Sequence, residues 1–290
     1  MHRRYLRIVM FSYLWYINMY MVHVMDTKLE ALHRVLSSHQ PGIIAVSGGV
    51  DSSLLAALAK TWGFDYQSVF LGGPHLSPGE QEEAKDVIAN LGLPYVIGEF
   101  SPLEVPQAAA NGYARCYHCK TALIQTLKKY AHAWRGQVLD GSHLEDAAEF
   151  RPGRRALAEQ GVISPLAEAK MAKEDIRTHA RALGLEQAEN PSRPCLMTRF
   201  AYGYAMSAQE LVKVGRAEDE LHRMGLNLFR IRFPAEGGVL LHIHQSQENW
   251  VLPRQAAIIQ CMEQAGFSRF SMELIPKLSG YFDQGNPTLA

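Results

Sequence analysis

The first half of the chain alternates between two kinds of apolar pattern. Between Thr27 and Ser38, apolar residues recur at helical spacing, which predicts an amphipathic helix. The short run Gly42–Val46 is apolar and rich in β-branched residues, which favours a buried strand. The two patterns then alternate. They predict helices near 52–63, 78–93 and 117–132, and strands near 66–72, 93–100 and 136–142.

Strands that alternate with helices predict a parallel sheet joined by right-handed crossovers. We therefore expect the α/β class, with a doubly wound, mostly parallel sheet whose ligand lies at the carboxyl ends of the strands. From Ser207 the order becomes helix, strand, strand, helix, strand, which predicts a smaller C-terminal α+β domain. The expected boundaries give a nucleotide-binding domain at 26–200 and a substrate-binding and oligomerisation domain at 201–290.

The first 25 residues are basic, then apolar and aromatic, which raises the question of a signal peptide or a membrane anchor. Asn18 interrupts the apolar run, and no small-residue cleavage site follows it. The run is also too short and too polar for a spanning helix. We interpret residues 1–25 as a poorly ordered or non-native extension, and we expect a cytoplasmic protein with no membrane partner.

Charge and cysteine content narrow the choice of partner. Lysine plus arginine and aspartate plus glutamate are equal at 29 each, which argues against nucleic acid as the main partner. A local basic pocket for a phosphorylated small molecule remains compatible with this balance. Four cysteines in 290 residues do not make a secreted disulfide scaffold.

The segment Ala45–Ala59, AVSGGVDSSLLAALA, concentrates glycines and serines between a strand and a helix. Glycines let the backbone approach a ligand closely, and a helix start offers amide N–H groups with the positive end of the dipole. These features predict a phosphate site. An aspartate in an anion site predicts a bridging divalent cation, here Mg²⁺ on Asp51. The expected nucleotide-binding residues of this turn are Ser47, Gly48, Gly49, Asp51, Ser52 and Ser53.

Two common nucleotide motifs do not fit this turn, because no G-K-[ST] follows it and G-x-G-x-x-G is absent. S-G-G-x-D-S after a strand is the pattern of the PP-loop ATP pyrophosphatases, and the chain resembles that superfamily. The resemblance implies an adenine nucleotide alpha hydrolase-like fold that grips the pyrophosphate of ATP and adenylates an oxygen of a second substrate. The alternative is a serine-rich turn that only caps a helix.

Later segments resemble one branch of this superfamily, the LarE-type sacrificial sulfur transferases. The resemblance runs from about Thr27 to Ile275. It rests on the order of four elements: Asp-Gly, Arg-Pro-Gly, Ser-Pro-Leu and Cys-Leu-x-[Ser/Thr]-Arg. The segments that carry the resemblance are Asp140–Arg177, Pro194–Phe200 and Phe229–Phe233.

The resemblance implies an enzyme that uses ATP and Mg²⁺ to adenylate a carboxylate of a pyridinium mononucleotide, the precursor of the nickel-pincer cofactor. A cysteine thiolate then attacks the acyl group and releases AMP. In some members the carbon–sulfur bond of that cysteine is cleaved, which leaves dehydroalanine and a thiocarboxylate. The sulfur-donating cysteine of the family falls on Cys195, and its members often form homo-oligomers.

The residues around Cys195 agree with this chemistry in kind. Cys195 lies between Arg193 and Arg199, and nearby cations favour a thiolate. A thiolate is a natural nucleophile for an acyl-adenylate, which has a good leaving group. The alternative is a buried, inert thiol.

Cys116 and Cys119 form a C-x-x-C, which departs from a one-cysteine mechanism. With Cys195 they offer three thiolates, which suit a 4Fe–4S cluster with one open iron that delivers sulfur catalytically. This resembles the three-cysteine branch of the family and certain PP-loop tRNA thiolases. A zinc site with His118 or His143 as fourth ligand, ordinary cysteines and a disulfide remain alternatives. The fourth cysteine, in the apolar helix AAIIQCM, is expected in the core.

Several charged residues complete the predicted site. The resemblance implies that Lys120 and Lys173 contact the ATP phosphates and that Gly141 and Arg151 lie against the nucleotide. Glu145 and Asp146 either help to hold magnesium or lie in a solvated loop.

A second set of charged residues is expected at the substrate. Arg230 and Arg232 alternate on one predicted strand and therefore share a face, where two guanidiniums fit a substrate phosphate. We expect Arg199 and Thr198 to join them. His242 and His244 also alternate, and we interpret these two as half-exposed strand histidines rather than a metal pair.

Three rival functions remain from the sequence. A tRNA thiolase would carry more C-x-x-C pairs or a basic surface. An amidating ligase of the NAD-synthetase or GMP-synthetase type would use ammonia and would not need Cys195. A regulatory nucleotide-binding module would show no turnover, and an assay for AMP release would identify it.

Overall fold

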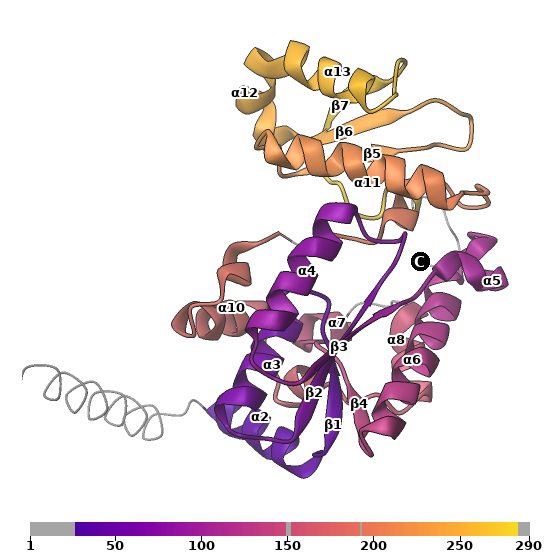
Figure 1. Cartoon of the computed structure of the whole chain (residues 1–290). Coiled ribbons are helices and arrows are strands. Elements are labelled where there is room, and N and C mark those ends of the chain that lie inside the picture. The colour runs from indigo at the N-terminus through magenta and orange to yellow at the C-terminus, as the bar shows by residue number, and fades with distance from the viewer. Residues whose placement is uncertain (1–26, 149–151, 192, 284–290) are drawn as a thin grey trace, which may run out of the picture.

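The computed structural model describes residues 27–148, 152–191 and 193–283. The interpretation of residues 1–25 and the role expected for Arg151 lie outside the described residues. The described chain forms two lobes, each built around its own sheet and its own hydrophobic core (Figure 1).

The sheet of the first lobe has four parallel strands in the order β3-β2-β1-β4. These strands are β1 (Gly42–Ala45), β2 (Tyr66–Gly72), β3 (Tyr95–Glu99) and β4 (Gln137–Leu139). Their order confirms the α/β class and the parallel pairing expected from the sequence. The carboxyl ends of all four strands therefore meet at one edge of the sheet, where ligands of such folds bind.

Helices cover both faces of this sheet because alternate side chains of each buried strand point to opposite sides. On β2, Tyr66 and Phe70 join the core beneath four helices: α2 (Thr27–Ser38), α3 (Val50–Thr61), α4 (Pro78–Asn90) and α10 (Lys173–Ala182). Val69 and Leu71 pack on the other face against α6 (Arg115–Ala133). The remaining helices of this lobe are α5 (Pro106–Ala109), α7 (Leu144–Ala148), α8 (Pro152–Glu159) and α9 (Pro165–Glu168).

The second lobe has the predicted helix-strand-strand-helix-strand order. Its sheet runs β5-β6-β7, with β5 antiparallel and β7 parallel to β6. The elements are α11 (Ala208–Arg223), β5 (Phe229–Arg232), β6 (Leu240–His244), α12 (Glu248–Val251), α13 (Gln255–Gln264) and β7 (Ser271–Ile275).

The loop that carries Cys195 packs with the second lobe. Leu196, Met197 and Phe200 are buried in the core formed by α11 and the second sheet. Phe200 also pairs with Phe233, just after β5, in an isolated β-bridge. Packing therefore fixes the Cys195 loop to the second lobe, although it follows the first lobe in the chain.

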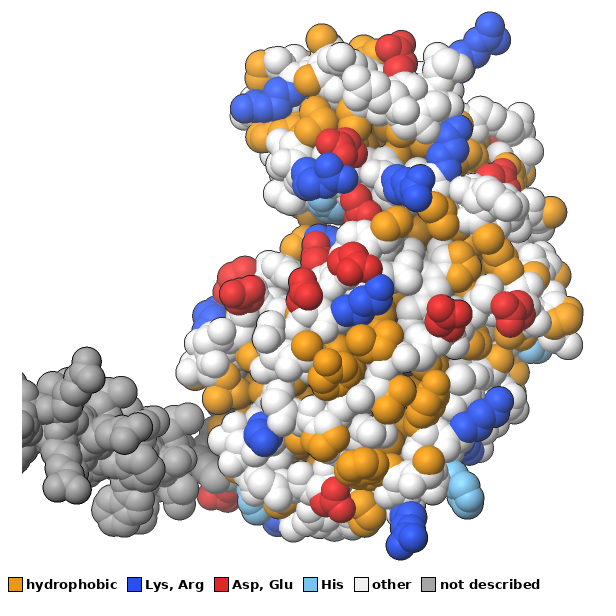
Figure 2. Space-filling model, in the orientation of Figure 1, with side chains coloured by type: hydrophobic (Ala, Val, Ile, Leu, Met, Phe, Trp, Pro, Cys, Tyr) orange, Lys and Arg blue, Asp and Glu red, His pale blue; other side chains and the backbone are white. Residues whose placement is uncertain are grey.

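The two lobes meet along the start of α4 and the middle of α11 (Figure 1). The outline of the molecule narrows between the lobes, and acidic and basic side chains gather there (Figure 2). No helix among the described residues is long and apolar enough to cross a membrane.

Candidate active site

The turn between β1 and α3 has the geometry of a phosphate loop. Gly48 has a positive φ of 81°, and a Cβ at this position would lie 2.9 Å from that of Ala84 on α4. Only glycine meets both conditions. The Ser47 N–H donates to the Ser52 hydroxyl at 3.1 Å, which ties the turn to the first helical residues. The N-terminus of α3 follows at Val50, with Gly49 as its N-cap.

The segment after β4 closes against the same helix start. A Cβ on Gly141 would lie 2.9 Å from the backbone nitrogen of Ser52, so glycine permits this approach. Asp140, which is buried, accepts hydrogen bonds from the hydroxyls of Ser142 and Ser164, both at 2.7 Å. These contacts fix the edge of the site opposite the turn.

Asp51 and Lys173 form an ion pair at the mouth of the site. The Lys173 ammonium donates to both carboxylate oxygens of Asp51 at 2.7 Å. The backbone N–H of Lys173 donates to the carboxylate of Glu145, and this hydrogen bond helps lower the pKa of Glu145. The structure thus brings together two residues, 122 positions apart, that were expected at magnesium and ATP phosphates.

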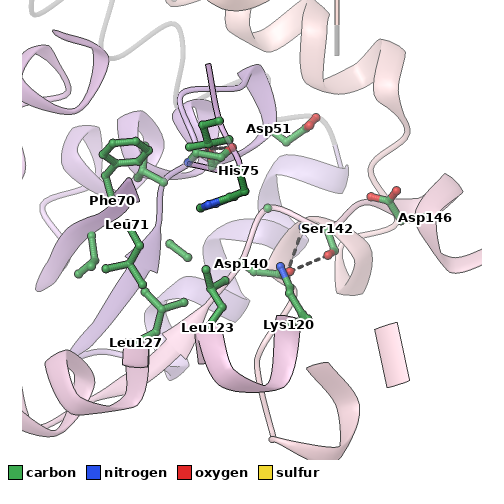
Figure 3. Close-up of a pocket in the computed structure, with 17 residues that line it drawn as sticks. Asp51, Phe70, Leu71, His75, Lys120, Leu123, Leu127, Asp140, Ser142 and Asp146 are labelled. Carbon is green, nitrogen blue, oxygen red and sulfur yellow. Dashed lines mark hydrogen bonds between the residues drawn. The ribbon is translucent and has the colours of Figure 1, made fainter. Parts of the chain in front are cut away.

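A cavity of about 300 Å³ lies between these elements at the carboxyl ends of the strands. One side is apolar, and Figure 3 shows Phe70, Leu71, Leu123 and Leu127 there. The other side is polar. Its lining side chains include Ser47, Asp51, Lys120, Asp140, Ser142 and Asp146, and Gly141 lines it between Asp140 and Ser142. A slot with one apolar and one polar side suits a nucleotide, with the base against the aliphatic groups and the phosphates at the loop.

Four described residues expected at the nucleotide do not line this cavity: Gly48, Gly49, Ser53 and Lys173. Gly48 packs against α4, Lys173 pairs with Asp51 at the mouth of the site, and the hydroxyl of Ser53 is buried with no hydrogen-bond partner among the described residues. Arg151 lies outside the described residues.

His75 lines the cavity and was missed by sequence reasoning. Its imidazole points into the space between the apolar and polar sides (Figure 3), and its Nδ1 is buried without a partner among the residues that the structure describes. Burial lowers the pKa of His75 to about 4, so the ring is neutral at physiological pH. The backbone oxygen of His75 accepts from the Leu196 N–H at 2.9 Å. The available sequence signal was its place just after the carboxyl end of β2.

Cys195 therefore immediately precedes Leu196, the residue whose N–H is hydrogen-bonded to His75 in the cavity wall. It immediately precedes the short 3-10 helix Leu196–Arg199. Burial raises the pKa of the Cys195 thiol to about 11. Arg199 acts in the expected direction and lowers the pKa of Cys195, but burial outweighs it; Arg193 pairs with Glu83 and Arg199 with Glu218.

Cys116 and Cys119 lie in the first turns of α6, within electrostatic reach of Cys195. Burial, then repulsion from the other two thiolates, raises the pKa of Cys119 to about 12. In residues 27–148, 152–191 and 193–283, however, no group of three or more His, Cys, Asp or Glu side chains is arranged to hold a metal ion. The three thiols are thus neighbours, but as placed they do not form a metal centre.

The proposed zinc ligand His143 is already engaged. Its ring contacts the carboxylates of Glu145 at 2.8 Å and Asp146 at 3.4 Å. Cys261, as expected, is buried in the core of the second lobe.

Arg199 is engaged in a buried ion pair rather than exposed to a ligand. Its guanidinium donates to both carboxylate oxygens of Glu218 on α11, at 2.7 and 2.8 Å. Its Nη1 donates to the Thr198 hydroxyl at 2.9 Å. Glu218 also accepts from the backbone of β5, from the N–H of Ile231 at 3.0 Å. This network joins the Cys195 loop to α11 and β5.

Arg230 and Arg232 project from β5 near this pair, and neither forms an ion pair with a described carboxylate. Burial, then repulsion from Arg199, lowers the pKa of each to about 10. Arg232 donates to the backbone oxygen of Leu278, and its guanidinium lies 4.9 Å from the ring centre of Tyr281. The C-terminal segment therefore covers one of the two cations.

The histidines of β6 differ from one another. His242 is completely buried and packs against Tyr281 with ring centres 4.5 Å apart, so its interpretation as half-exposed is wrong. Burial lowers the pKa of His242. His244 is partly exposed, and its Nδ1 lies 2.7 Å from the Ser246 hydroxyl.

The sheet, the glycine–serine turn and the two-sided cavity define an α/β nucleotide-binding protein of the PP-loop type. No protein-family model matches the chain. An uncharacterised protein of Synechocystis sp. is 36% identical over 211 residues, which cover 72% of this chain and 79% of the relative.

Two further relatives have names that state a function. The pyridinium-3,5-bisthiocarboxylic acid mononucleotide synthase of Lactiplantibacillus plantarum is 29% identical, over 71% of this chain and 76% of its own. The tRNA-specific 2-thiouridylase MnmA of Azorhizobium caulinodans is 28% identical, over 66% of this chain and 59% of its own. The chain belongs to the PP-loop ATP pyrophosphatase superfamily.

Proposed function

We propose that this protein is an ATP-dependent, AMP-forming sulfur transferase. It adenylates a carboxylate of a pyridinium mononucleotide and converts that carboxylate to a thiocarboxylate through Cys195. One observation carries the proposal: the hydrogen bond from Leu196 to His75 places the cysteine loop directly against the wall of the nucleotide cavity. The relative from Lactiplantibacillus plantarum is a pyridinium-3,5-bisthiocarboxylic acid mononucleotide synthase by name, and this supports a pyridinium mononucleotide as substrate.

The nucleotide step uses the polar side of the cavity. The amides of the turn and of the α3 start bind phosphate oxygens, and Lys120 and Lys173 offset their charge. Asp51 fits a magnesium ion, because Mg²⁺ prefers a carboxylate together with phosphate and water oxygens. A bound Mg²⁺ would neutralise the phosphates and orient the pyrophosphate as leaving group. For this to happen, the Lys173 ammonium has to move from Asp51 to the phosphates.

The chemistry then proceeds in balanced steps. A substrate carboxylate oxygen bonds to the α-phosphorus, and pyrophosphate leaves. The Cys195 sulfur, after loss of its proton, bonds to the acyl carbon, and AMP leaves with the electron pair of the acyl–oxygen bond. Removal of the Cys195 α-proton then breaks the carbon–sulfur bond, which leaves dehydroalanine and the free thiocarboxylate. No oxidant or reductant is needed.

The raised pKa of Cys195 fits a nucleophile that reacts only once, when it gives up its sulfur. The thiol stays protonated, and therefore little reactive, while the site holds no substrate. Arg230 and Arg232 offer an anion site for the substrate phosphate, because their buried charges have no carboxylate partner in the described chain.

A 4Fe–4S cluster on Cys116, Cys119 and Cys195 is the alternative source of sulfur, favoured by the mutual electrostatic reach of the three thiols. The thiols would have to draw together first, so we assign no step to the cluster. A tRNA substrate is less favoured because the net charge of the chain is zero.

Anaerobic purification tests both sources of sulfur in one preparation. Turnover with Mg-ATP and the carboxylated pyridinium mononucleotide should release AMP and lower the mass of the polypeptide by about 34 Da, one H2S. About four irons per chain, lost in Cys116→Ala, with no mass change would identify the cluster as the source. The sulfur-transfer proposal fails if AMP is formed without thiocarboxylate, mass change or iron.

A further inference from the structure

The segment Gly73–Gly79 touches three parts of the molecule. His75 and Leu76 line the nucleotide cavity. The backbone oxygen of His75 holds the N–H of Leu196, next to the reactive cysteine. The end of the segment starts α4 and reaches α11 of the second lobe. One short stretch of chain therefore connects the nucleotide, the thiol and the substrate lobe.

Asp219 of α11 holds the far end of this segment. One of its carboxylate oxygens accepts from the Ser77 hydroxyl at 2.5 Å, and the other accepts from the Gly79 N–H at 2.7 Å. Ser77 is buried and is also the N-cap of α4, in a capping box with Glu80. A carboxylate at a helix N-terminus interacts favourably with the helix dipole, so the contact between α11 and α4 is electrostatically matched.

Two glycines permit this close approach. A Cβ on Gly79 would lie 2.8 Å from the carboxyl group of Asp219, and one on Gly215 would lie 3.0 Å from both Ser77 and Leu196. The backbone of α11 at Gly215 therefore lies directly against the backbone of Ser77 and against the Leu196 side chain of the cysteine loop. Arg193 adds a second polar contact from the cysteine loop to α4, at 3.3 Å from Glu83.

We propose that Asp219 is a positioning residue: by holding Ser77 and Gly79 it fixes the segment Gly73–Gly79, and so sets the position of the Cys195 thiol relative to the nucleotide cavity. The catalytic consequence rests on the proposed function, whereas the mechanical link does not. Asp219 touches neither the nucleotide cavity nor the cysteine, so it acts only through this segment.

The mechanical link is tested by alkylation of each cysteine with iodoacetamide, followed by peptide mass spectrometry. Asp219→Asn should raise the rate at Cys195 about fivefold, which corresponds to about 1 kcal/mol of local opening. The rate at Cys261, in the core of the second lobe, should not change. The matched control at Cys195 is Glu220→Gln, because Glu220, the next residue on the same helix, pairs with Arg223 on the surface. An unchanged rate at Cys195 would overturn the proposal.

The catalytic consequence is tested by separating the two half-reactions. Asp219→Asn should leave ATP–pyrophosphate exchange within about twofold and slow thiocarboxylate formation about tenfold. Gly79→Ala perturbs the same contact from α4 and should give the same separation, which keeps the test valid if Asp219→Asn folds poorly. Equal losses in both half-reactions, or no loss in the second, would overturn the proposal. If the wild type shows no ATP–pyrophosphate exchange, the proposed function is refuted instead. The alkylation experiment would still test whether Asp219 controls access to Cys195.

Discussion

Two ion pairs of similar length serve the two lobes differently. Lys173 and Asp51, at 2.7 Å, lie at the mouth of the cavity with side chains 32% and 25% exposed. Arg199 and Glu218, also at 2.7 Å, are 3% and 8% exposed. A partly exposed pair contributes little stability and is easily exchanged for a ligand, whereas breaking a buried pair leaves an unpaired charge. Burial thus separates charges available to a ligand from charges that hold the fold.

Removing the acid of the buried pair should have the largest effect. Glu218→Gln leaves Arg199 buried without a counter-charge, and we expect the free energy of unfolding to fall by about 3–5 kcal/mol. Urea denaturation measures this loss, and Glu220→Gln on the exposed side of the same helix should stay within about 0.5 kcal/mol. A loss below about 1 kcal/mol for Glu218→Gln would show that the two pairs do not differ in this way.

Breaking the exposed pair of Lys173 and Asp51 should lower activity while leaving stability nearly unchanged. Asp51→Asn and Lys173→Met should each lower the rate of ATP–pyrophosphate exchange about 100-fold, equal to about 2.7 kcal/mol of transition-state stabilisation. The free energy of unfolding should change by less than about 1 kcal/mol in both variants. If stability falls in parallel with exchange, this pair is structural and the comparison fails.

His75 in the cavity is a further group whose charge state is set by burial. Burial lowers the pKa of His75 to about 4 from its usual 6.5, so protonation favours the unfolded chain. Its contribution is fully present above pH 6.5 and is lost as the pH falls toward 4, by about 3 kcal/mol. Thermal melts of wild type and His75→Asn from pH 7 to 4 measure this. Parallel curves would mean that His75 is not held neutral by the fold.

The smallest effect is expected at Ser53. Its hydroxyl is fully buried, has no hydrogen-bond partner in the described part of the chain and does not line the cavity. Ser53→Ala should therefore leave nucleotide affinity unchanged and alter stability by less than about 1 kcal/mol. Calorimetric titration with ATP checks this, and a tenfold loss of affinity would mean that the Ser53 hydroxyl contacts the phosphates after all.

Local periodicity was enough to predict the strands and the longer helices of both lobes. The helix Thr27–Ser38 and the strand Tyr66–Gly72 were predicted with the bounds that the structure shows. Both depend on patterns within one segment, namely helical spacing of leucines and a continuous apolar run. The phosphate turn is equally local, because glycine, serine and the helix start lie within a few residues.

Contacts between distant residues could not be predicted in this way. Arg199 carries no sequence mark that assigns it to Glu218 on the following helix, and Cys195 carries none that shows its partial burial. The flanking arginines predict a thiolate, but the sequence does not show the desolvation that outweighs Arg199 and raises the pKa of Cys195. His75 was missed for the same reason, since its role depends on where Leu196 folds back.

The most direct test of the account separates adenylation from sulfur transfer at Cys195. Cys195→Ala should retain ATP–pyrophosphate exchange with the carboxylated pyridinium mononucleotide at close to the wild-type rate, because the nucleotide cavity contains no atom of Cys195. It should form no thiocarboxylate, and acyl-adenylate should accumulate on the enzyme. Thiocarboxylate production by Cys195→Ala at the wild-type rate would contradict the account, since the sulfur would then pass through another group.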